Sequence, residues 1–410
     1  MKRAVPADRW HLSPTNRVAA GTRAVAHIFH TQEDDMRLRA RLGFTVVAVL
    51  LVFAVTAFAA DKGEALRGAA EKGDAQVQYI LGLMYYKGYG VAKNEQEAAV
   101  WFRRAADQGF AMAQYSLGLM YYKGKGVAKD EQEAAVWFRR AADQGFAQAQ
   151  YSLGLMYDRG EGVAQDHKQA AAWWRRAADQ GFAMAQFSLG NSYYKGKGVV
   201  AKDRKEAAAW FRRAADQGLA RAQYNLGLMY DEGEVVAKDG KEAVAWYRRA
   251  ADQGHAKAQY NLGRMYYLGE GVAKDGKEAV AWYRRAADQG HAMAQYNLGR
   301  MYYLGEGVPK DEQEAVVWFR RAADQGLADA QFILGLMYYQ GEGVAKDEQE
   351  AVVWIRRAAD QGLADAQFIL GLMHLKGKGV AQDPKQAAAW LRRAADQGHA
   401  QAKAALQKRQ

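Results

Sequence analysis

The residues of this chain that could do chemistry include those of its glycine-rich loops. A Gly-x-Gly-Val sequence, as at residues 124–127, offers backbone N–H groups that could surround a phosphate. A phosphate-binding loop of this kind follows a β-strand and continues into Gly-Lys-Ser/Thr. Here the loops follow helical patterns and lack that continuation. We therefore reject a nucleotide-binding interpretation of these loops.

Histidine is the second residue type with possible chemistry. His255 and His291 stand 36 residues apart at equivalent points of a repeating sequence. Neighbouring packed helices lie about 10 Å apart, which is too far for two side chains to share one metal ion. His374 takes a position that is tyrosine in the other copies. No Ser-His-Asp set, carboxylate pair or metal-ligand cluster stands out, so we predict no catalytic residue, metal site or cofactor, and a protein that is not an enzyme.

These residues belong to a segment that recurs nine times with a period of 36 residues, extended to 37 in the fourth copy. A period in this range predicts a solenoid, in which each unit buries its apolar face only against its neighbours. The marker Arg-Arg-Ala-Ala-Asp-Gln-Gly ends at Gly109, Gly145, Gly181, Gly218, Gly254, Gly290, Gly326, Gly362 and Gly398.

The first half of the repeat at residues 110–145 has the pattern of an α-helix. Ala113, Leu117 and Met120 fall on one stripe, and the glycines after Lys123 permit the positive φ of a helix end. Gly118 lies inside this helix, where glycine costs roughly 1 kcal/mol relative to alanine. Because every copy keeps this glycine, we expect a close approach of a bulky neighbour, either Trp137 or Phe138.

The second half of the repeat predicts another helix. Asp130 and Glu133 have the spacing of a capping box, in which the Asp caps the helix and the Glu reaches back to the cap. Trp137 and Phe138 lie on its apolar stripe and are expected to be core residues. Gly145 ends the helix, so each repeat is predicted to be a helix-turn-helix unit.

Three motifs carry a resemblance to a known family: Ala-x-Ala-Gln-Tyr-x-Leu-Gly-x-Met-Tyr, Gly-x-Gly-Val-x-x-Asp and Ala-x-x-Trp-x-Arg-x-Ala-Ala-x-x-Gly. Residues 74–398 resemble nine Sel-one-like repeats, which are relatives of tetratricopeptide repeats. The resemblance implies an all-α, right-handed α/α superhelix that acts as an adaptor in protein complexes. Some bacterial members are cysteine-rich. This chain has no cysteine, so any β-lactam-related activity of that branch is not carried over.

The start of the chain reads as an export signal. Residues 36–41 are basic, residues 42–59 are apolar, and Ala57-Phe58-Ala59 suits a cleavage site. We expect a signal peptide at residues 36–59 and an unstructured upstream extension at residues 1–35. This predicts a bacterial periplasmic or secreted protein. The alternative is an uncleaved inner-membrane anchor, and only that form would contact the membrane.

Two short segments flank the repeats. Residues 60–73 resemble the second half of a repeat and predict an N-terminal capping helix. Residues 399–410 begin a first helix and stay polar, as a C-terminal capping helix should.

The charge of the chain is +11, and eighteen of its basic residues are the nine Arg-Arg pairs. The pairs lie near helix C-termini, where the macrodipole favours cations, and an Asp follows three and four residues on. We interpret them as a self-paired, solvated face and keep an acidic envelope polymer or another anionic partner as alternatives. The export signal and the interleaved acids argue against nucleic acid.

A second stripe on the first helix changes from copy to copy while the core stripe stays constant. By analogy with tetratricopeptide repeats it would face the concave side of the superhelix. Its aromatic, Met and Arg content suits recognition, although drift of unconstrained solvent positions explains the variation equally well. The candidate binding residues are Tyr122, Lys123, Arg159, Tyr194, Arg264, Tyr267, Arg300, Tyr303 and Tyr339.

The sequence therefore predicts an exported scaffold that binds a protein or peptide along its concave face. The alternatives are a binder of a cell-envelope polymer or glycan and, less favoured, a hydrolase like the cysteine-rich relatives.

Overall fold

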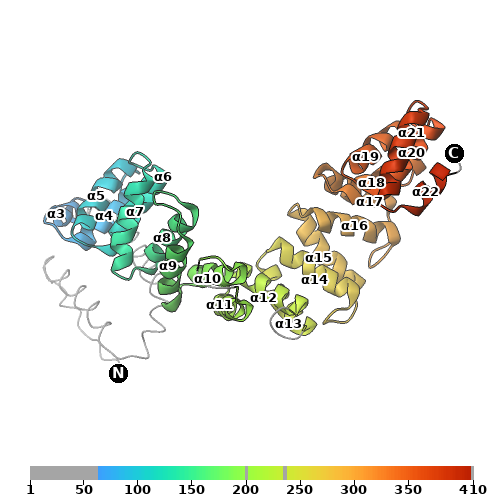
Figure 1. Cartoon of the computed structure of the whole chain (residues 1–410). Helices are drawn as coiled ribbons and strands as arrows, with labels where there is room; N and C mark the ends of the chain where they lie inside the picture. The colour runs from blue at the N-terminus through green and yellow to red at the C-terminus, as the bar shows by residue number, and fades with distance from the viewer. Residues whose placement is uncertain (1–62, 199–201, 234–237, 408–410) are drawn as a thin grey trace, which may run out of the picture. The chain divides into compact units, whose positions relative to one another are not determined.

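A computed structural model describes residues 63–198, 202–233 and 238–407. These residues form twenty α-helices and no strand (Figure 1). The predicted upstream extension at residues 1–35 and the predicted signal peptide at residues 36–59 lie outside the described residues. No helix in the described part of the chain is both long and apolar enough to cross a bilayer.

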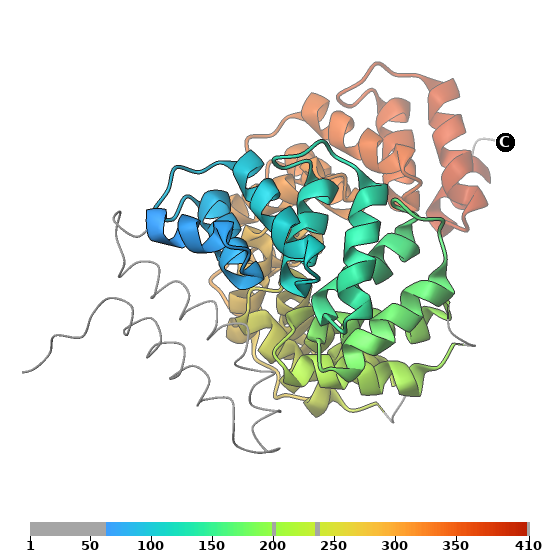
Figure 2. The same ribbon diagram turned by 90° about the vertical axis from the view of Figure 1, so that its left-hand side faces the viewer.

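The chain divides into two compact units, one ending at Ala149 and the other beginning at Gln150. The boundary falls inside helix α8 (Ala147–Arg159). Within the first unit, consecutive helices pack side by side as hairpins, which are the blue to teal ribbons in Figure 2. The second unit repeats the same pairing of each helix with the next.

Each repeat contributes two helices of 13 residues. The first helices are α4 (Ala75–Lys87), α6 (Ala111–Lys123), α8, α10 (Ala183–Lys195), α12 (Ala220–Glu232), α14 (Ala256–Leu268), α16 (Ala292–Leu304), α18 (Ala328–Gln340) and α20 (Ala364–Lys376). The second helices are α5 (Glu95–Asp107), α7 (Glu131–Asp143), α9 (His167–Asp179), α11 (Arg204–Asp216), α13 (Gly240–Asp252), α15 (Gly276–Asp288), α17 (Glu312–Asp324), α19 (Glu348–Asp360) and α21 (Pro384–Asp396). This arrangement confirms the predicted α/α solenoid of helix-turn-helix repeats.

The helix ends follow from local chemistry. Gly124 ends α6 in the left-handed conformation, with φ of 65°, and its N–H returns to the last turn of the helix. Asp130 begins α7, because its carboxylate accepts a hydrogen bond of 2.9 Å from the Glu133 N–H. Gly145, with φ of 89°, makes the turn into the next repeat.

Close packing accounts for the glycine inside the first helix. A Cβ on Gly118 would lie 2.7 Å from Cδ1 of Phe138, so no side chain fits. The neighbour is Phe138 rather than Trp137. The second glycine of most Gly-x-Gly loops has a related role. A Cβ on Gly126 would lie 2.0 Å from the backbone oxygen of Glu95 in the preceding repeat. These loops therefore serve the packing between repeats.

Within each unit, a buried glutamine joins a repeat to the one before it. Gln114 is 4% exposed, and its Nε2 donates to the backbone oxygen of Ala106 in the preceding repeat at 3.1 Å. Its Oε1 accepts from Nε2 of Gln144, at the end of its own repeat, at 2.7 Å. A buried amide needs such partners. The same pair of bonds recurs along the chain, for example around Gln259 and Gln295.

Short helices flank the repeats. Gln78 of the first repeat donates to the backbone oxygen of Ala70 in α3 (Gly63–Glu71), as later repeats do to their predecessors. At the other end α22 (Ala400–Gln407) packs Ala402 against Leu391 and Ala394.

Candidate protein-binding face

The arginine pairs have structural partners. Trp137 stacks on Arg140 of its own helix, with Cζ 4.4 Å from the ring centroid, and lies 5.7 Å from Cζ of Arg103 in the preceding repeat. Arg103 also donates to the hydroxyl of Tyr121. The second arginine of every pair stacks on the tryptophan of its own repeat in this way. The pairs contact aromatic rings, where pairing with the following Asp residues was expected.

The expected capping box forms only in part. Asp130 caps the helix, but the Glu133 carboxylate accepts a hydrogen bond of 2.8 Å from Trp137 Nε1. The indole N–H is buried and needs an acceptor, so the Glu serves the tryptophan. Asp130, Trp137, Gly118 and Gly145 thus take part in helix ends and packing within the repeat.

We call the variable stripe of the first helices, together with the loop residue after each helix-ending glycine, the first-helix face. In the sixth to eighth repeats it contains Arg264, Tyr267, Arg300, Tyr303 and Tyr339. Leu268 and Leu304 follow the two tyrosines in the sequence and are each 50% exposed.

Arg264 is held inside this face. Its guanidinium forms an ion pair with Asp231, which is only 8% exposed, and lies 3.2 Å from Oε2 of Glu270. The Asp231 and Glu270 carboxylates raise the pKa of Arg264 against the opposing effect of burial. Both Asp231 and Arg264 depart from the Tyr and Leu that most repeats carry there. Arg264 therefore joins neighbouring repeats and is not free for a partner.

Two of the predicted tyrosines are fixed by carboxylates of the following loop. Tyr303 donates to Oε2 of Glu342 at 2.8 Å, and Tyr267 makes the equivalent bond to Glu306. These hydrogen bonds, followed by burial, raise the pKa of both phenols. Arg300 also hydrogen-bonds Tyr267. The rings are consequently held in place with one side against lysines, 5.5 Å from Lys274 and 5.6 Å from Lys310.

Sequence reasoning missed Glu306 and Glu342 as partners of these tyrosines. The available signal was the glutamate that follows the helix-ending glycine in the sixth, seventh and eighth repeats. It also missed that Leu268 and Leu304 are the most exposed apolar side chains of this segment.

The remaining candidates lie at equivalent positions of other repeats. Tyr194 lies 5.7 Å from Lys202 and 5.6 Å from Arg204, and Tyr339 lies 5.8 Å from Lys346, all measured from the cationic group to the ring centroid. Tyr122 is half-buried and Lys123 is exposed.

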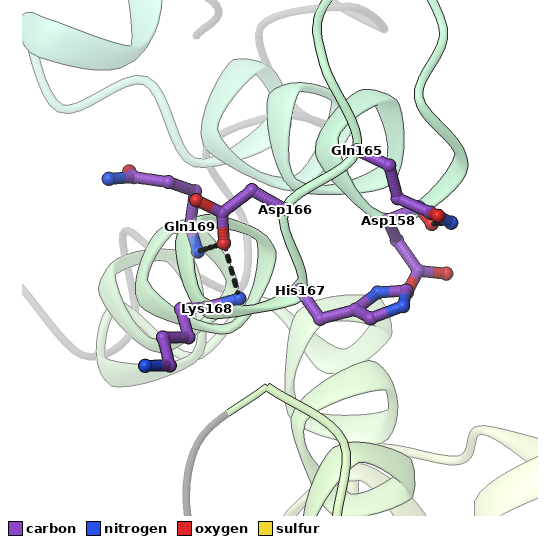
Figure 3. A network of polar contacts seen from close by, with 6 residues as sticks. All are labelled: Asp158, Gln165, Asp166, His167, Lys168 and Gln169. Carbon is purple, nitrogen blue, oxygen red and sulfur yellow. Dashed lines mark hydrogen bonds and ion pairs between the residues drawn. The ribbon is translucent and has the colours of Figure 1, made fainter.

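The third repeat replaces the tyrosine with an acid. Figure 3 shows the ring of His167 turned toward Asp158, and the Asp166 carboxylate at the start of α9. Nδ1 of His167 lies 2.9 Å from Oδ1 of Asp158, and Gln165 donates to the backbone oxygen of Asp158 at 2.7 Å. Arg159, a predicted binding residue, lies 3.7 Å from Glu161. This pair is a local link between helix and loop.

Over residues 63–198, 202–233 and 238–407, no three His, Cys, Asp or Glu side chains converge as a metal site would require. The ring of His255 is tilted against Tyr224 and the ring of His291 stacks on Tyr260, each pair with ring centroids 4.8 Å apart. An open hollow of about 450 Å³ borders His255, Met184 and Arg221. It is unenclosed, unlike a site that surrounds a small ligand.

A stack of helix hairpins with a constant core and a variable first-helix face defines an α/α solenoid repeat protein. The chain belongs to the Sel1 repeat family. The family's repeat model matches residues 75–110, 111–146, 147–182, 183–219, 220–255, 256–291, 292–327, 328–363 and 364–399.

Solved structures agree. The chain is 37% identical to a Sel1 repeat protein from Oxalobacter formigenes, over 79% of this chain and 93% of that one, with a TM-score of 0.60. It is 35% identical to a protective antigen of uropathogenic Escherichia coli strains that displays an SLR fold, over 83% of this chain and 88% of that one, with a TM-score of 0.53. No curated protein matches the chain.

Proposed function

We propose that the chain is an exported scaffold that binds a protein or peptide segment along its first-helix face. Sel1 repeat scaffolds generally mediate contacts between proteins. The finer proposal rests on one observation. Leu268 and Leu304 are each half exposed, and each follows in the sequence a tyrosine whose hydroxyl is already held by a carboxylate.

This arrangement has the properties of a recognition surface. Fixed aromatic rings lose little conformational freedom on binding, and Tyr and Arg are enriched among the energetic centres of protein interfaces. Lys310 already forms an ion pair with Glu312, with 2.8 Å between Nζ and Oε1. Around Tyr303, the apolar and aromatic side chains are therefore the groups that a partner would cover. A protein segment covers such groups better than a polar polymer does.

Affinity capture tests the binding proposal. The chain from residue 60 onward would be immobilised and exposed to solubilised native envelope, and the captured proteins quantified by mass spectrometry. We expect Tyr267→Ala with Arg300→Ala to reduce capture of a specific protein while circular dichroism shows that the helix content is kept. The matched control is Val317→Ala with Val353→Ala, which alters side chains that are each 43% exposed on the second helices α17 and α19. Equal capture by both variants would count against the first-helix face.

Two further measurements separate the rival functions. Retention on purified peptidoglycan that resists excess protein would indicate polymer binding instead. Turnover of a chromogenic β-lactam, abolished by a first-helix substitution, would indicate a hydrolase.

Export has its own test. The intact mass of the natural protein should correspond to a chain that begins after Ala59. A mass that includes residues 36–59 would show that the signal is retained as an anchor.

A further inference from the structure

The first-helix face of the N-terminal unit carries lysines that no acid neutralises. Lys93 and Lys129 pair with Glu95 and Glu131 at 3.1 Å and 2.7 Å. Lys87, Lys123 and Lys125 form no ion pair with any residue that the structure describes. We call these three residues, with Tyr86 and Tyr89, the lysine strip.

Two of these lysines converge on one ring. Nζ of Lys87 lies 5.6 Å from the centroid of Tyr86, and Nζ of Lys125, from the loop of the next repeat, lies 5.7 Å from the same centroid. A phenol ring attracts each ammonium group only weakly when both remain near water. An anion bound beside Tyr86 would therefore interact with both ammonium groups.

In a repeat of the second unit, the lysine at the position of Lys125 does form an ion pair. Lys378 occupies the position of Lys125 and lies 3.6 Å from Glu348, the carboxylate that Lys346 also reaches. Glu95 occupies the position of Glu348 but pairs only with Lys93. The loop geometry thus permits an ion pair between this lysine and the glutamate of the preceding repeat. Lys125 and Glu95 do not form that ion pair.

The same positions have opposite charge in later repeats. Where the second repeat has Lys125, the sixth, seventh and eighth have Glu270, Glu306 and Glu342. The repeat fold consequently accepts either sign at this position, and the lysines of the first unit are not required for folding.

We propose that the lysine strip binds an acidic segment of a partner protein, one that carries apolar side chains among its carboxylates. The lysines supply the charge complement, which sets specificity and association rate. Tyr89 is 45% exposed, and Leu83 and Leu119 are half-buried beside the strip. These apolar groups favour a protein segment over a purely ionic polymer. The inference rests on the proposed function, because it assigns a partner chemistry to one part of the first-helix face.

Fluorescence anisotropy with a defined probe tests it. The probe is a labelled peptide of glutamates interrupted by leucine and tyrosine, and its partner probe has glutamine at every glutamate. The protein is the full chain without its signal. We expect Lys87→Gln with Lys125→Gln to weaken binding of the acidic peptide by about tenfold. Lys93→Gln with Lys129→Gln removes the same charge from the same loops and should change the affinity less than about twofold, because those lysines are already paired.

Three results would overturn the proposal: equal binding of the glutamine probe, equal losses in the two variants, or equal affinity for polyphosphate of the same charge. Circular dichroism verifies that both variants keep their helix content. The Tyr267→Ala, Arg300→Ala variant should bind the acidic peptide normally. Failure of the lysine strip would thus leave the capture experiment on the later repeats intact, and the reverse also holds.

Discussion

The Glu133 carboxylate accepts a hydrogen bond from the Trp137 indole, with 2.8 Å between Oε1 and Nε1. This bond links the first turn of a helix to a ring that stacks on arginines of two repeats. The glutamate recurs in seven repeats, and the third and ninth have Gln169 and Gln386 in its place. Nε1 of Trp173 and of Trp390 has no partner in these two repeats.

Glu133→Ala should destabilise the protein by about 1–3 kcal/mol, because the buried indole N–H loses its acceptor. Denaturant unfolding monitored by circular dichroism measures the change. Gln132→Ala, on the exposed side of the same turn, is the control and should be nearly neutral.

Gln386→Glu should stabilise the ninth repeat by about 0.5–1.5 kcal/mol, since it offers a carboxylate to the unpartnered Trp390. Glu97 does not reach Trp101 in the first repeat, where Nε1 is also unpartnered, so the gain requires the geometry found around Trp137. An unchanged unfolding midpoint would show that the ninth helix lacks that geometry.

Gly118→Ala should destabilise the protein although alanine is the better helix former. The added Cβ would lie 2.7 Å from Phe138, and overpacking of this kind costs about 1–3 kcal/mol. Phe138→Leu in the same chain should recover only a small part of the loss, because a Cβ on Gly371 would still lie 2.9 Å from Cγ of Leu391, the residue at this position in the ninth repeat. Thermal unfolding of the single and double variants measures the coupling between the two positions. If the changes in stability of the single variants add up to that of the double variant, the two residues are not coupled.

Acid should weaken the sixth and seventh repeats. Nδ1 of His255 accepts from the Ala258 N–H at 3.3 Å, and Nδ1 of His291 does the same for Ala294. Burial, followed by nearby cations, lowers the pKa of His255 and His291 below the ordinary 6.5. The unfolded chain therefore takes up protons first as the pH falls below about 6.5, so stability declines there and is fully present above it.

Phenylalanine occupies this position in the second, third and fourth repeats, which supplies the variant for this test. His255→Phe with His291→Phe should lose less melting temperature between neutral and mildly acidic pH than the natural chain loses. Identical pH profiles would place the acid sensitivity elsewhere.

Asp231 and Arg264 should be coupled. Removing either partner by Asp231→Tyr or Arg264→Leu leaves a partly buried charge behind, whereas both changes together restore the residues that most repeats carry. We expect a coupling energy of about 1 kcal/mol or more from a double-mutant cycle, with the double variant the more stable. Additive losses would show that the ion pair contributes nothing specific.

The sequence was sufficient for the fold because every level of it agreed: a fixed period, an Asp cap and a glycine end in nearly every repeat. The sequence-based prediction of side-chain contacts was incomplete where one residue could have two possible partners. Glu133 suits both a cap and an indole, and Arg103 suits both a carboxylate and a ring. Periodicity could not decide between them, because the competing partner comes from a side chain that only the packed repeats bring close.

For the first-helix face, the sequence identified the variable positions but not the contacts or the exposure of their side chains. It could not tell that Arg264 is committed to Asp231, since the two are 33 residues apart in different repeats. It could not tell that Leu268 is exposed while Leu262, in the same helix, is fully buried.

The glutamine that ties a hairpin to its predecessor within each unit makes the chain extendable. Its partners are a main-chain oxygen and a glutamine side chain that nearly every repeat supplies. The repeat that follows a duplicated or deleted copy therefore finds the same two hydrogen-bonding partners. Unequal recombination between such similar gene segments would lengthen or shorten the protein by whole units without breaking a junction. The number of repeats can in this sense change during evolution, while the surface residues of each added repeat can be substituted independently.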